Sequence, residues 1–408
     1  MAAAAVTGMG CVSALGTGVP IFWTALNAGR SGIKRITQFG TEGLRNTSAG
    51  CVELSPELDA LARQQRLKGG RLELFARWAI QEALADAGWS PEAFAKARAA
   101  LVVGTSLGMS LVAPTVPADP LEVYDDGASG ADFAALAEAL GEPFHLEEHT
   151  TIVSTACASG THAIALGRDL LERGDYDVVI AGGSDALDRM KYLGHSALAT
   201  LTEGVPRPFS RARDGTLFGE GAAFLVLERS GERGKGKAYA YCTGAGYSTD
   251  IHHLTAPDPA GRGAAAAMSA AIRDAGLDPE QVDHVNLHGS GTALNDDAEA
   301  LAMSAVFGGR ARDIPSTSIK AAVAHAMGAA GAIEAVATVL SIHRGEVPPT
   351  LNVAPSEVAF DLGLVCERSV KRPIRTALNN SFGFGGANGV VLFSAADPNE
   401  RRAVGSTG

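Results

Sequence analysis

The feature of this sequence that most constrains its fold is an internal repeat. LADAGWSPE at residues 84–92 precedes the apolar run ALVVG, and IRDAGLDPE at residues 272–280 precedes HVNLHGSGT. Each copy is typical of an amphipathic helix that ends at a glycine and is followed by a proline and a short strand. The repeat indicates two copies of one unit instead of two unrelated domains.

A second pair of segments supports the duplication. Residues 154–171 and 316–336 both begin with Ser-Thr and continue as helices rich in Ala and Gly. Ala-rich helices can resemble one another by chance, but two pairs in the same order favour duplication. Alternating strands and helices predict parallel sheets covered on both faces. We expect two similar α/β halves, residues 1–232 and 233–397, joined at a charged Gly-rich linker (230–237) and followed by a flexible tail (398–408).

Composition and charge limit the classes of function. The chain has 408 residues, 46% hydrophobic and 19% charged, as a globular protein has, and its net charge of −11 argues against nucleic acid as a partner. Its five cysteines are widely spaced with no CxxC, which argues against a disulfide framework or a zinc site. Neither a signal peptide nor a membrane span is recognised. We therefore expect a soluble cytoplasmic protein.

Cys157 is the candidate nucleophile. It lies in TACASG, after a β-branched run and at the start of an Ala/Gly-rich helix. The positive end of a helix dipole favours the thiolate, so the position predicts a lowered pKa and a reactive sulfur. The alternative is a buried structural cysteine, which accounts for most free cysteines.

Two histidines are candidates for chemistry beside it. His288 ends the strand HVNL before the turn GSGT, and the carboxyl ends of strands are where α/β proteins place their sites. His325, in KAAVAHAMGAAG, is expected on the helix that repeats the Cys157 helix. A pseudo-twofold axis would bring these two helices, and hence Cys157 and His325, together. Taken singly, each histidine could be an ordinary satisfied polar group.

Charged residues near the histidines suggest a compensated buried network. Asp296 and Glu299 are spaced to share one helical face, Lys320 precedes His325, and Glu334 follows it. Their alternative interpretation is a set of surface charges.

The Gly-rich segment NNSFGFGGANGVV (379–391) is expected to be a turn between two strands. It contains neither a P-loop nor a GxGxxG pattern after a strand, so a phosphate cradle is not indicated. Its backbone N–H groups could instead form part of an oxyanion hole, with Phe384 gating an apolar channel.

Together these motifs resemble the β-ketoacyl-acyl-carrier-protein synthases, in the elongating type I/II branch of the thiolase superfamily. The resemblance rests on TACASG, HGSGT, IKAAVAHAMGAAGAIE, RPFSRARDGTLFGEGA and NNSFGFGGAN, and it spans nearly the whole chain. It implies a thiolase fold, layered αβαβα with its halves related by a pseudo-twofold, and a homodimer or a heterodimer with a chain-length-factor-like subunit. It also implies decarboxylative condensation of a malonyl group with an acyl group, both carried on the phosphopantetheine of acyl carrier protein, with no metal or other cofactor.

The resemblance implies a role for each matching residue. Cys157 is the acylated nucleophile, and His288 and His325 serve decarboxylation and stabilise the enolate oxygen. Lys320 is the companion lysine, and the supporting carboxylates are Asp296, Glu299 and Glu334. Phe384 is the gate, and its N–H completes the oxyanion hole with that of Cys157. The acyl pocket is assigned to Leu107 and Phe382.

Three departures from the family pattern stand out. Ala324 replaces a glycine and Ser290 a threonine, and little effect is expected of either. The segment 111–149 differs from that of fatty acid enzymes, which suggests a specialised synthase for polyketide or aryl-polyene assembly. A coenzyme A-dependent thiolase or initiating synthase is disfavoured by the two histidines. A non-catalytic scaffold subunit is disfavoured by the intact cysteine.

An acidic carrier protein needs a basic docking patch on this acidic chain. The densest candidate is Arg63, Arg66, Lys68 and Arg71, and a second cluster is Arg207, Arg211 and Arg213. A solvated helix face is the alternative interpretation of the first cluster.

Overall fold

The repeat of the sequence is a repeat of structure. The computed structural model describes residues 4–64, 67, 69–108, 133–229 and 238–396. Five strands and three helices recur in the same order in each half. In the first half they are β1 (Ala4–Ser13), α3 (Gly70–Asp86), β5 (Ala99–Gly104), α5 (Phe133–Gly141), β6 (Thr150–Val153), α6 (Ser159–Arg173), β7 (Val178–Asp185) and β8 (Gly221–Arg229). In the second they are β9 (Ala240–Thr249), α8 (Arg262–Asp274), β10 (His284–Asn286), α9 (Ala293–Phe307), β11 (Ser316–Thr317), α11 (Ala330–Arg344), β14 (Thr376–Phe382) and β15 (Ala387–Ser394).

Shorter elements connect these units. They are α1 (Val19–Asn27), α2 (Pro56–Gln64), α4 (Pro91–Phe94), α7 (Arg189–Ala197), α10 (Lys320–Val323), β2 (Gly16–Thr17), β3 (Lys34–Arg35), β4 (Ser48–Ala49), β12 (Glu346–Val347) and β13 (Val370–Lys371). The single 3-10 turns are η2 (Glu142–Phe144), η3 (Glu147–His149), η4 (Pro279–Gln281), η5 (Gly308–Arg312), η6 (Met327–Ala329), η7 (Pro355–Glu357) and η8 (Phe384–Gly386).

Strand order shows the duplication directly. It runs β6-β5-β7-β8-β1 in the first half and β11-β10-β14-β15-β9 in the second, which is the same order of corresponding strands. The two halves join where Ala4–Val6 of β1 pairs with residues 240–242 of β9. The expectation of parallel sheets holds for β5, β6 and β7 and for β10, β11 and β14. It is wrong for β1, β8, β9 and β15, which pair antiparallel because β8 and β15 return beside the strand that precedes them.

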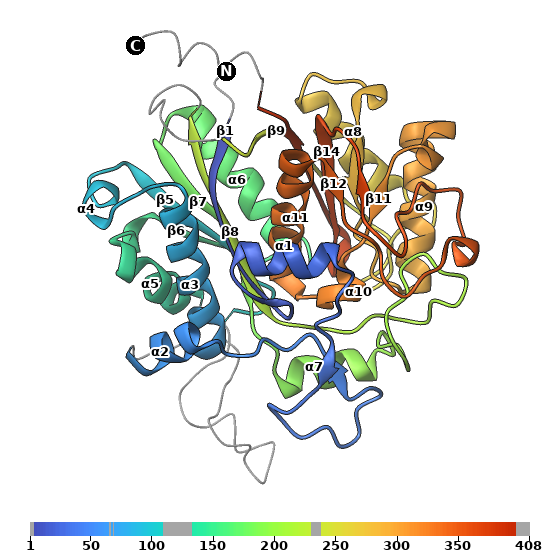
Figure 1. Cartoon of the computed structure of the whole chain (residues 1–408), viewed down its shortest axis with the longest axis horizontal. Coiled ribbons are helices and arrows are strands. Elements are labelled where there is room, and N and C mark those ends of the chain that lie inside the picture. Colours follow the sequence, from blue (N-terminus) through green and yellow to red (C-terminus); the bar gives the residue numbers. More distant parts are fainter. Residues whose placement is uncertain (1–3, 65–66, 68, 109–132, 230–237, 397–408) are drawn as a thin grey trace.

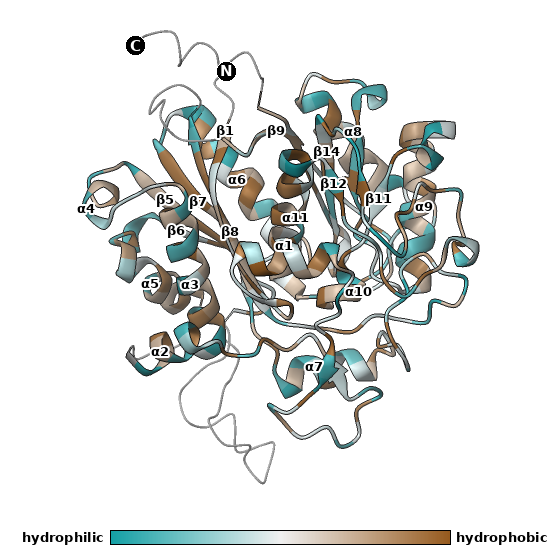
Figure 2. Ribbon diagram, in the orientation of Figure 1, coloured by the Kyte–Doolittle hydropathy of each residue, from teal (hydrophilic) through white to brown (hydrophobic). Residues whose placement is uncertain are grey.

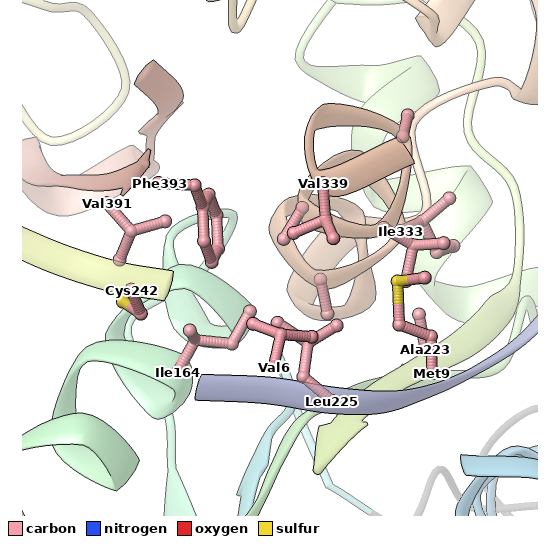
Figure 3. Close-up of a cluster of buried hydrophobic side chains, with 14 of the residues drawn as sticks. Val6, Met9, Ile164, Ala223, Leu225, Cys242, Ile333, Val339, Val391 and Phe393 are labelled. Carbon is pink, nitrogen blue, oxygen red and sulfur yellow. The ribbon is translucent and has the colours of Figure 1, made fainter. Parts of the chain in front are cut away.

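Two central helices lie between the two sides of the sheet (Figure 1), as an αβαβα layering requires. α6 packs on β7 and β5 and also reaches β15, while α11 packs on β14 and β8. Their apolar side chains and both sides of the sheet share one core, which includes Ile164, Ile333, Val6, Val391 and Phe393 (Figure 3). α3 covers the outer face of the first half, and α8 and α9 cover that of the second. Figure 2 shows apolar residues concentrated on the strands and central helices.

Glycines let the outer helices sit directly on the strands. A Cβ at Gly10 of β1 would overlap the carbonyl oxygen of Ala79 in α3, and a Cβ at Gly246 of β9 would overlap that of Ala267 in α8. These two glycines occupy corresponding places in the two halves. The glycine excess of the sequence is therefore partly a packing requirement that was duplicated with the fold.

Some sequence expectations fall outside the described residues. The linker at 230–237, the tail from 397, Arg66, Lys68 and residues 109–132 of the divergent segment are among them. In the remainder of that segment, α5 packs on α3, and Arg77 donates to the carbonyl of Ala139 at 2.9 Å. None of the helices in the described ranges has the length and apolar character that a membrane span needs.

Replacing Gly10 or Gly246 with alanine tests this packing. We expect either change to lower the free energy of unfolding by about 1–3 kcal/mol, because the helix must move away from the strand. Denaturant titration measures it. The matched control is Gly204→Ala, where a Cβ meets nothing within 4 Å. Equal stability of all three variants would contradict the close approach.

Candidate active site

Cys157 lies in a sharp turn between β6 and α6. The preceding residue, Ala156, has φ 51°, a left-handed conformation that is uncommon for alanine. Ser159, at the start of α6, holds the turn: its hydroxyl donates to the carbonyl of Ala156 at 2.6 Å and accepts from the N–H of Thr155 at 2.9 Å. The strained turn presents the Cys157 thiol to a cavity of about 440 Å³.

The surroundings of Cys157 differ from the expectation of a lowered pKa. Desolvation raises the pKa of the thiol to about 11, and Lys320 and the backbone N–H of Phe384 oppose that rise without cancelling it. The dipole at the start of α6 favours the thiolate, but desolvation of the sulfur has the larger effect on its pKa. The resting thiol is neutral at pH 7, so it must lose its proton as it attacks.

His288 is positioned by a carboxylate and a lysine. It follows β10, and its N–H donates to Glu299 of α9 at 2.8 Å, as does that of Gly289. The ammonium of Lys320 donates to the carbonyl of His288 at 2.6 Å and lies 3.3 Å from its ring Nδ1. Since an ammonium can only donate, Nδ1 is the accepting nitrogen and the ring carries its proton on Nε2.

His325 reaches the same state by a different route. It lies in the segment between α10 and η6, so the expectation that it sits on the helix is wrong: the chain leaves helical geometry at Ala324. Its N–H donates to Leu217 and its carbonyl accepts from Gly219, which ties the residue to the chain before β8. Its Nδ1 accepts from the N–H of Met327 at 3.2 Å, which again leaves the proton on Nε2.

The two imidazoles are close and neutral. Their ring centroids lie 5.3 Å apart with planes at 80°. Burial lowers the pKa of both rings well below the usual value, and Lys320 lowers both further. Lys320 is itself buried and paired with Glu334, whose pKa burial raises to about 7. Burial, supported by the charge of Lys320, therefore maintains two neutral N–H donors in the site.

The other two carboxylates hold backbone. Asp296 accepts from the N–H of Phe209 at 2.7 Å and from that of Gly291 at 3.2 Å, and Glu299 holds the turn after His288. Burial raises the pKa of Asp296 to about 6 and that of Glu299 to about 7. The predicted network is thus buried, and each acid shapes one turn of the site.

The Gly-rich turn faces Cys157 from β14 and β15. Gly383 comes close to the Cys157 turn, since an added Cβ would lie 3.2 Å from the N–H nitrogen of Cys157 and 3.0 Å from the carbonyl of Thr155. Phe384 follows, and its backbone N–H lowers the pKa of the Cys157 thiol. Phe382 and Phe384 line the cavity with Cys157, His288 and His325.

Other predicted residues lie elsewhere. Leu107 is 56% exposed and does not line this cavity. Arg63 pairs with Asp59 on the exposed face of α2. The expectation that Arg71 belongs to an exposed basic patch is wrong. Its guanidinium points inward, where it pairs with the buried Glu220 at 2.5 Å and donates to the carbonyl of Val52.

Ala324 also departs from the expectation of little effect. It has φ 63° and ψ −179°, a region that is essentially reserved for glycine. Its methyl group sits close to Gly50 and Gly219, where an added Cβ would meet it at 2.7 Å and 3.2 Å. The strain lies directly before His325.

Sequence reasoning missed His195 and Phe218. Both line the cavity, and their rings stack at 3.7 Å between centroids. His195 comes from α7 and Phe218 from the loop before β8. Phe218 falls within the motif RPFSRARDGTLFGEGA, which pointed to the family but not to the site, and His195 falls within none of the motifs named above. Only the fold brings the two rings to the nucleophile.

A thiol that must lose a proton, beside two fixed neutral N–H donors, defines an acyl-transferring enzyme that works through a thioester. Among the described residues no group of three His, Cys, Asp or Glu is arranged to hold a metal.

Comparison with known proteins places the chain in a family. Residues 1–233 match the model of the β-ketoacyl synthase N-terminal domain and residues 239–354 that of the C-terminal domain. This chain belongs to the β-ketoacyl synthases. A 3-oxoacyl-[acyl-carrier-protein] synthase 2 of Coxiella burnetii is 33% identical over 404 residues, which cover 95% of this chain and 97% of that one.

Solved structures agree with the family. The ishigamide ketosynthase/chain length factor matches with a TM-score of 0.86 at 32% identity, over 97% of this chain and 99% of that one. A type II PKS ketosynthase bound to the hexaketide, in complex with its acyl-carrier protein, matches with a TM-score of 0.85 at 28% identity, over 97% and 100% of the two chains. The thiolase fold expected from the motifs is confirmed.

The strain at Ala324 predicts a stabilising substitution. Ala324→Gly should raise the free energy of unfolding by roughly 1–2 kcal/mol, the relief of strain less the entropy that glycine adds to the unfolded chain. Thermal or denaturant unfolding measures it. An unchanged or lower stability would show that alanine is accommodated without strain.

The neutral histidines predict an absence of titration. Burial and Lys320 lower the pKa values of both rings. The imidazole NMR chemical shifts of His288 and His325 should therefore remain those of the neutral ring from about pH 8 to about pH 5.5. Labelled histidine, with His288→Asn and His325→Asn for assignment, makes the measurement. A midpoint near 6.5 for either ring would contradict the predicted environment.

Proposed function

We propose that this chain is an elongating β-ketoacyl-acyl-carrier-protein synthase that lengthens an acyl chain by two carbons. One observation carries the proposal: Cys157 from the first half opens into the same cavity as His288 and His325 from the second. Both imidazoles hold their proton on Nε2, which suits them to donate to a carbonyl oxygen and to the enolate it becomes.

In the first step the acyl group moves to Cys157. The sulfur forms a bond to the acyl carbon, the C–S bond of the donor thioester breaks, and the proton of Cys157 ends on the departing thiol. The raised pKa of Cys157 is consistent with loss of that proton during attack, not before it. The N–H groups of Cys157 and Phe384 are the proposed donors to the tetrahedral oxyanion.

In the second step a malonyl thioester loses carbon dioxide. The electron pair of the breaking C–C bond forms an enolate, whose oxygen accepts from Nε2 of His288 and His325. The enolate carbon attacks the acyl carbon on Cys157, the C–S bond breaks, and the released thiolate takes up a proton. Neutral donors fit this role because they stabilise the enolate without protonating it outright, and burial together with the charge of Lys320 keeps both rings neutral.

The proposed partner is acyl carrier protein, which presents both substrates on phosphopantetheine, so no metal or organic cofactor is assigned. The solved ketosynthase in complex with its acyl-carrier protein supports this partner. Arg63 and, outside the described residues, Arg66 and Lys68 remain the proposed docking patch. Of the two residues expected to form the acyl pocket, Phe382 lines this cavity and is retained in the proposal, whereas Leu107 is not. All five cysteines are free, which fits a reducing compartment, and we place the enzyme in the cytoplasm.

A second candidate is the ketosynthase subunit of a specialised type II polyketide or aryl-polyene system, paired with a chain-length-factor subunit. The likeness to the ishigamide ketosynthase/chain length factor favours it over a homodimer. A catalytically silent subunit is a poorer fit, because Cys157, His288 and His325 form a complete site.

Mass spectrometry of the intact protein after incubation with an acyl-carrier protein tests the proposal. We expect one acyl adduct, lost in Cys157→Ala and retained in the matched control Cys366→Ala, which alters the other partly exposed cysteine. Cys157→Gln should lose condensation but keep malonyl decarboxylation, since both histidines remain.

Two results would overturn the assignment. Absence of an adduct with every acyl donor would indicate a scaffold subunit, and chain extension by Cys157→Gln would show that Cys157 is not the nucleophile.

A further inference from the structure

A third histidine enters the cavity and has no part in the proposed reaction. His195, on α7, lines the cavity together with Cys157, His288 and His325. The steps above use only the latter two as donors. The lining also includes the apolar side chains of Leu198, Phe218 and Phe384, the polar Thr200, and a fourth histidine, His253.

The ring of His195 is held in a column of aromatic rings. It stacks on Phe218 with centroids 3.7 Å apart and planes at 21°, and Phe218 in turn stacks on His325 at 5.4 Å and 22°. The ring of Phe384 lies 5.8 Å from His195 on another side. Its orientation is therefore fixed before any substrate arrives, as a selective polar contact requires.

One nitrogen of this ring is left for a ligand. Nδ1 lies 3.5 Å from the hydroxyl of Thr200, a long contact, and among the described residues none hydrogen-bonds to Nε2. Desolvation lowers the pKa of the ring to about 4, so it is a neutral imidazole at physiological pH. Such a ring offers one donor and one acceptor, and an apolar ligand would leave them unmatched.

We propose that His195 is a specificity-determining residue that hydrogen-bonds an oxygen on the acyl chain carried by Cys157. The site then selects acyl chains that bear a hydroxyl or keto oxygen over plain hydrocarbon chains of the same length. This inference rests on the proposed function, since it assigns the acyl group to this cavity. A site built to hydrogen-bond a substrate oxygen discriminates against the analogue that lacks it.

A structural role for His195 makes a different prediction. If the ring only supported His325 through Phe218, its loss would slow malonyl decarboxylation and leave the ratio between two acyl donors unchanged. The ratio between two donors separates the roles, because support of His325 acts on all donors alike.

The experiment compares acylation of Cys157 by hexanoyl, 3-hydroxyhexanoyl and 5-hydroxyhexanoyl thioesters of N-acetylcysteamine, followed by mass spectrometry. In the wild type we expect one hydroxylated donor to react about tenfold faster than hexanoyl, the effect of one good hydrogen bond. His195→Phe keeps a stacking ring but no polar nitrogen, and its ratio should fall to about one. His195→Gln keeps an amide within reach of the Nε2 position and should retain part of the ratio.

The outcomes separate this inference from the function it rests on. Equal rates for all donors in the wild type, or the same ratio in wild type and His195→Phe, would overturn the role of His195 and leave the synthase assignment intact. Loss of malonyl decarboxylation in His195→Phe with an unchanged ratio would assign it to support of His325. Absence of any adduct on Cys157 would overturn the proposed function itself.

Discussion

The close contact between the two central helices is the constraint on which the rest of the structure depends. A Cβ at Gly160 of α6 would come within 2.9 Å of the nitrogen of Ala332 in α11 and of the carbonyl of Gly328. The backbones of α6 and α11 can come this close only because residue 160 is a glycine. This approach brings the turn of Cys157, just before α6, to the segment of His325, just before α11. The pseudo-twofold is thus the means by which a nucleophile and its proton donors, from different halves, share one cavity.

The buried ammonium of Lys320 is the main charge acting on the residues that this packing brings together. A buried ammonium is costly unless paired, and Glu334 supplies the pair. The same ammonium contacts Nδ1 and the carbonyl of His288 and lowers the pKa values of both histidines. Its charge therefore acts on the histidines although Lys320 is not among the residues that line the cavity. The same charge lowers the pKa of Cys157 and so partly offsets the rise caused by desolvation.

Much of the fold and site could be predicted because it depends on residue types and spacings within short segments of the sequence. Gly88 and Gly276 both have the positive φ that the repeated helix ends called for, and the Gly-rich turn lies between β14 and β15 as expected. The errors have physical causes. Sequence spacing extended the helix to His325, whereas the backbone turns sharply at Ala324. The helix dipole suggested a lowered pKa for Cys157, but local sequence does not reveal that the fold desolvates the sulfur enough to raise it. Arg71 looked like part of a surface patch because its partner, Glu220, is far away in sequence.

The division of the site between the halves also shapes how the chain acquires activity. Pairing of β1 with β9 and contact of α6 with α11 join residues that are widely separated along the chain. Each such non-local contact closes a long loop, which costs chain entropy. The first half alone carries a thiol without donors, and the second carries donors without a thiol. The thiol and its donors therefore share a cavity only when both halves are folded and joined.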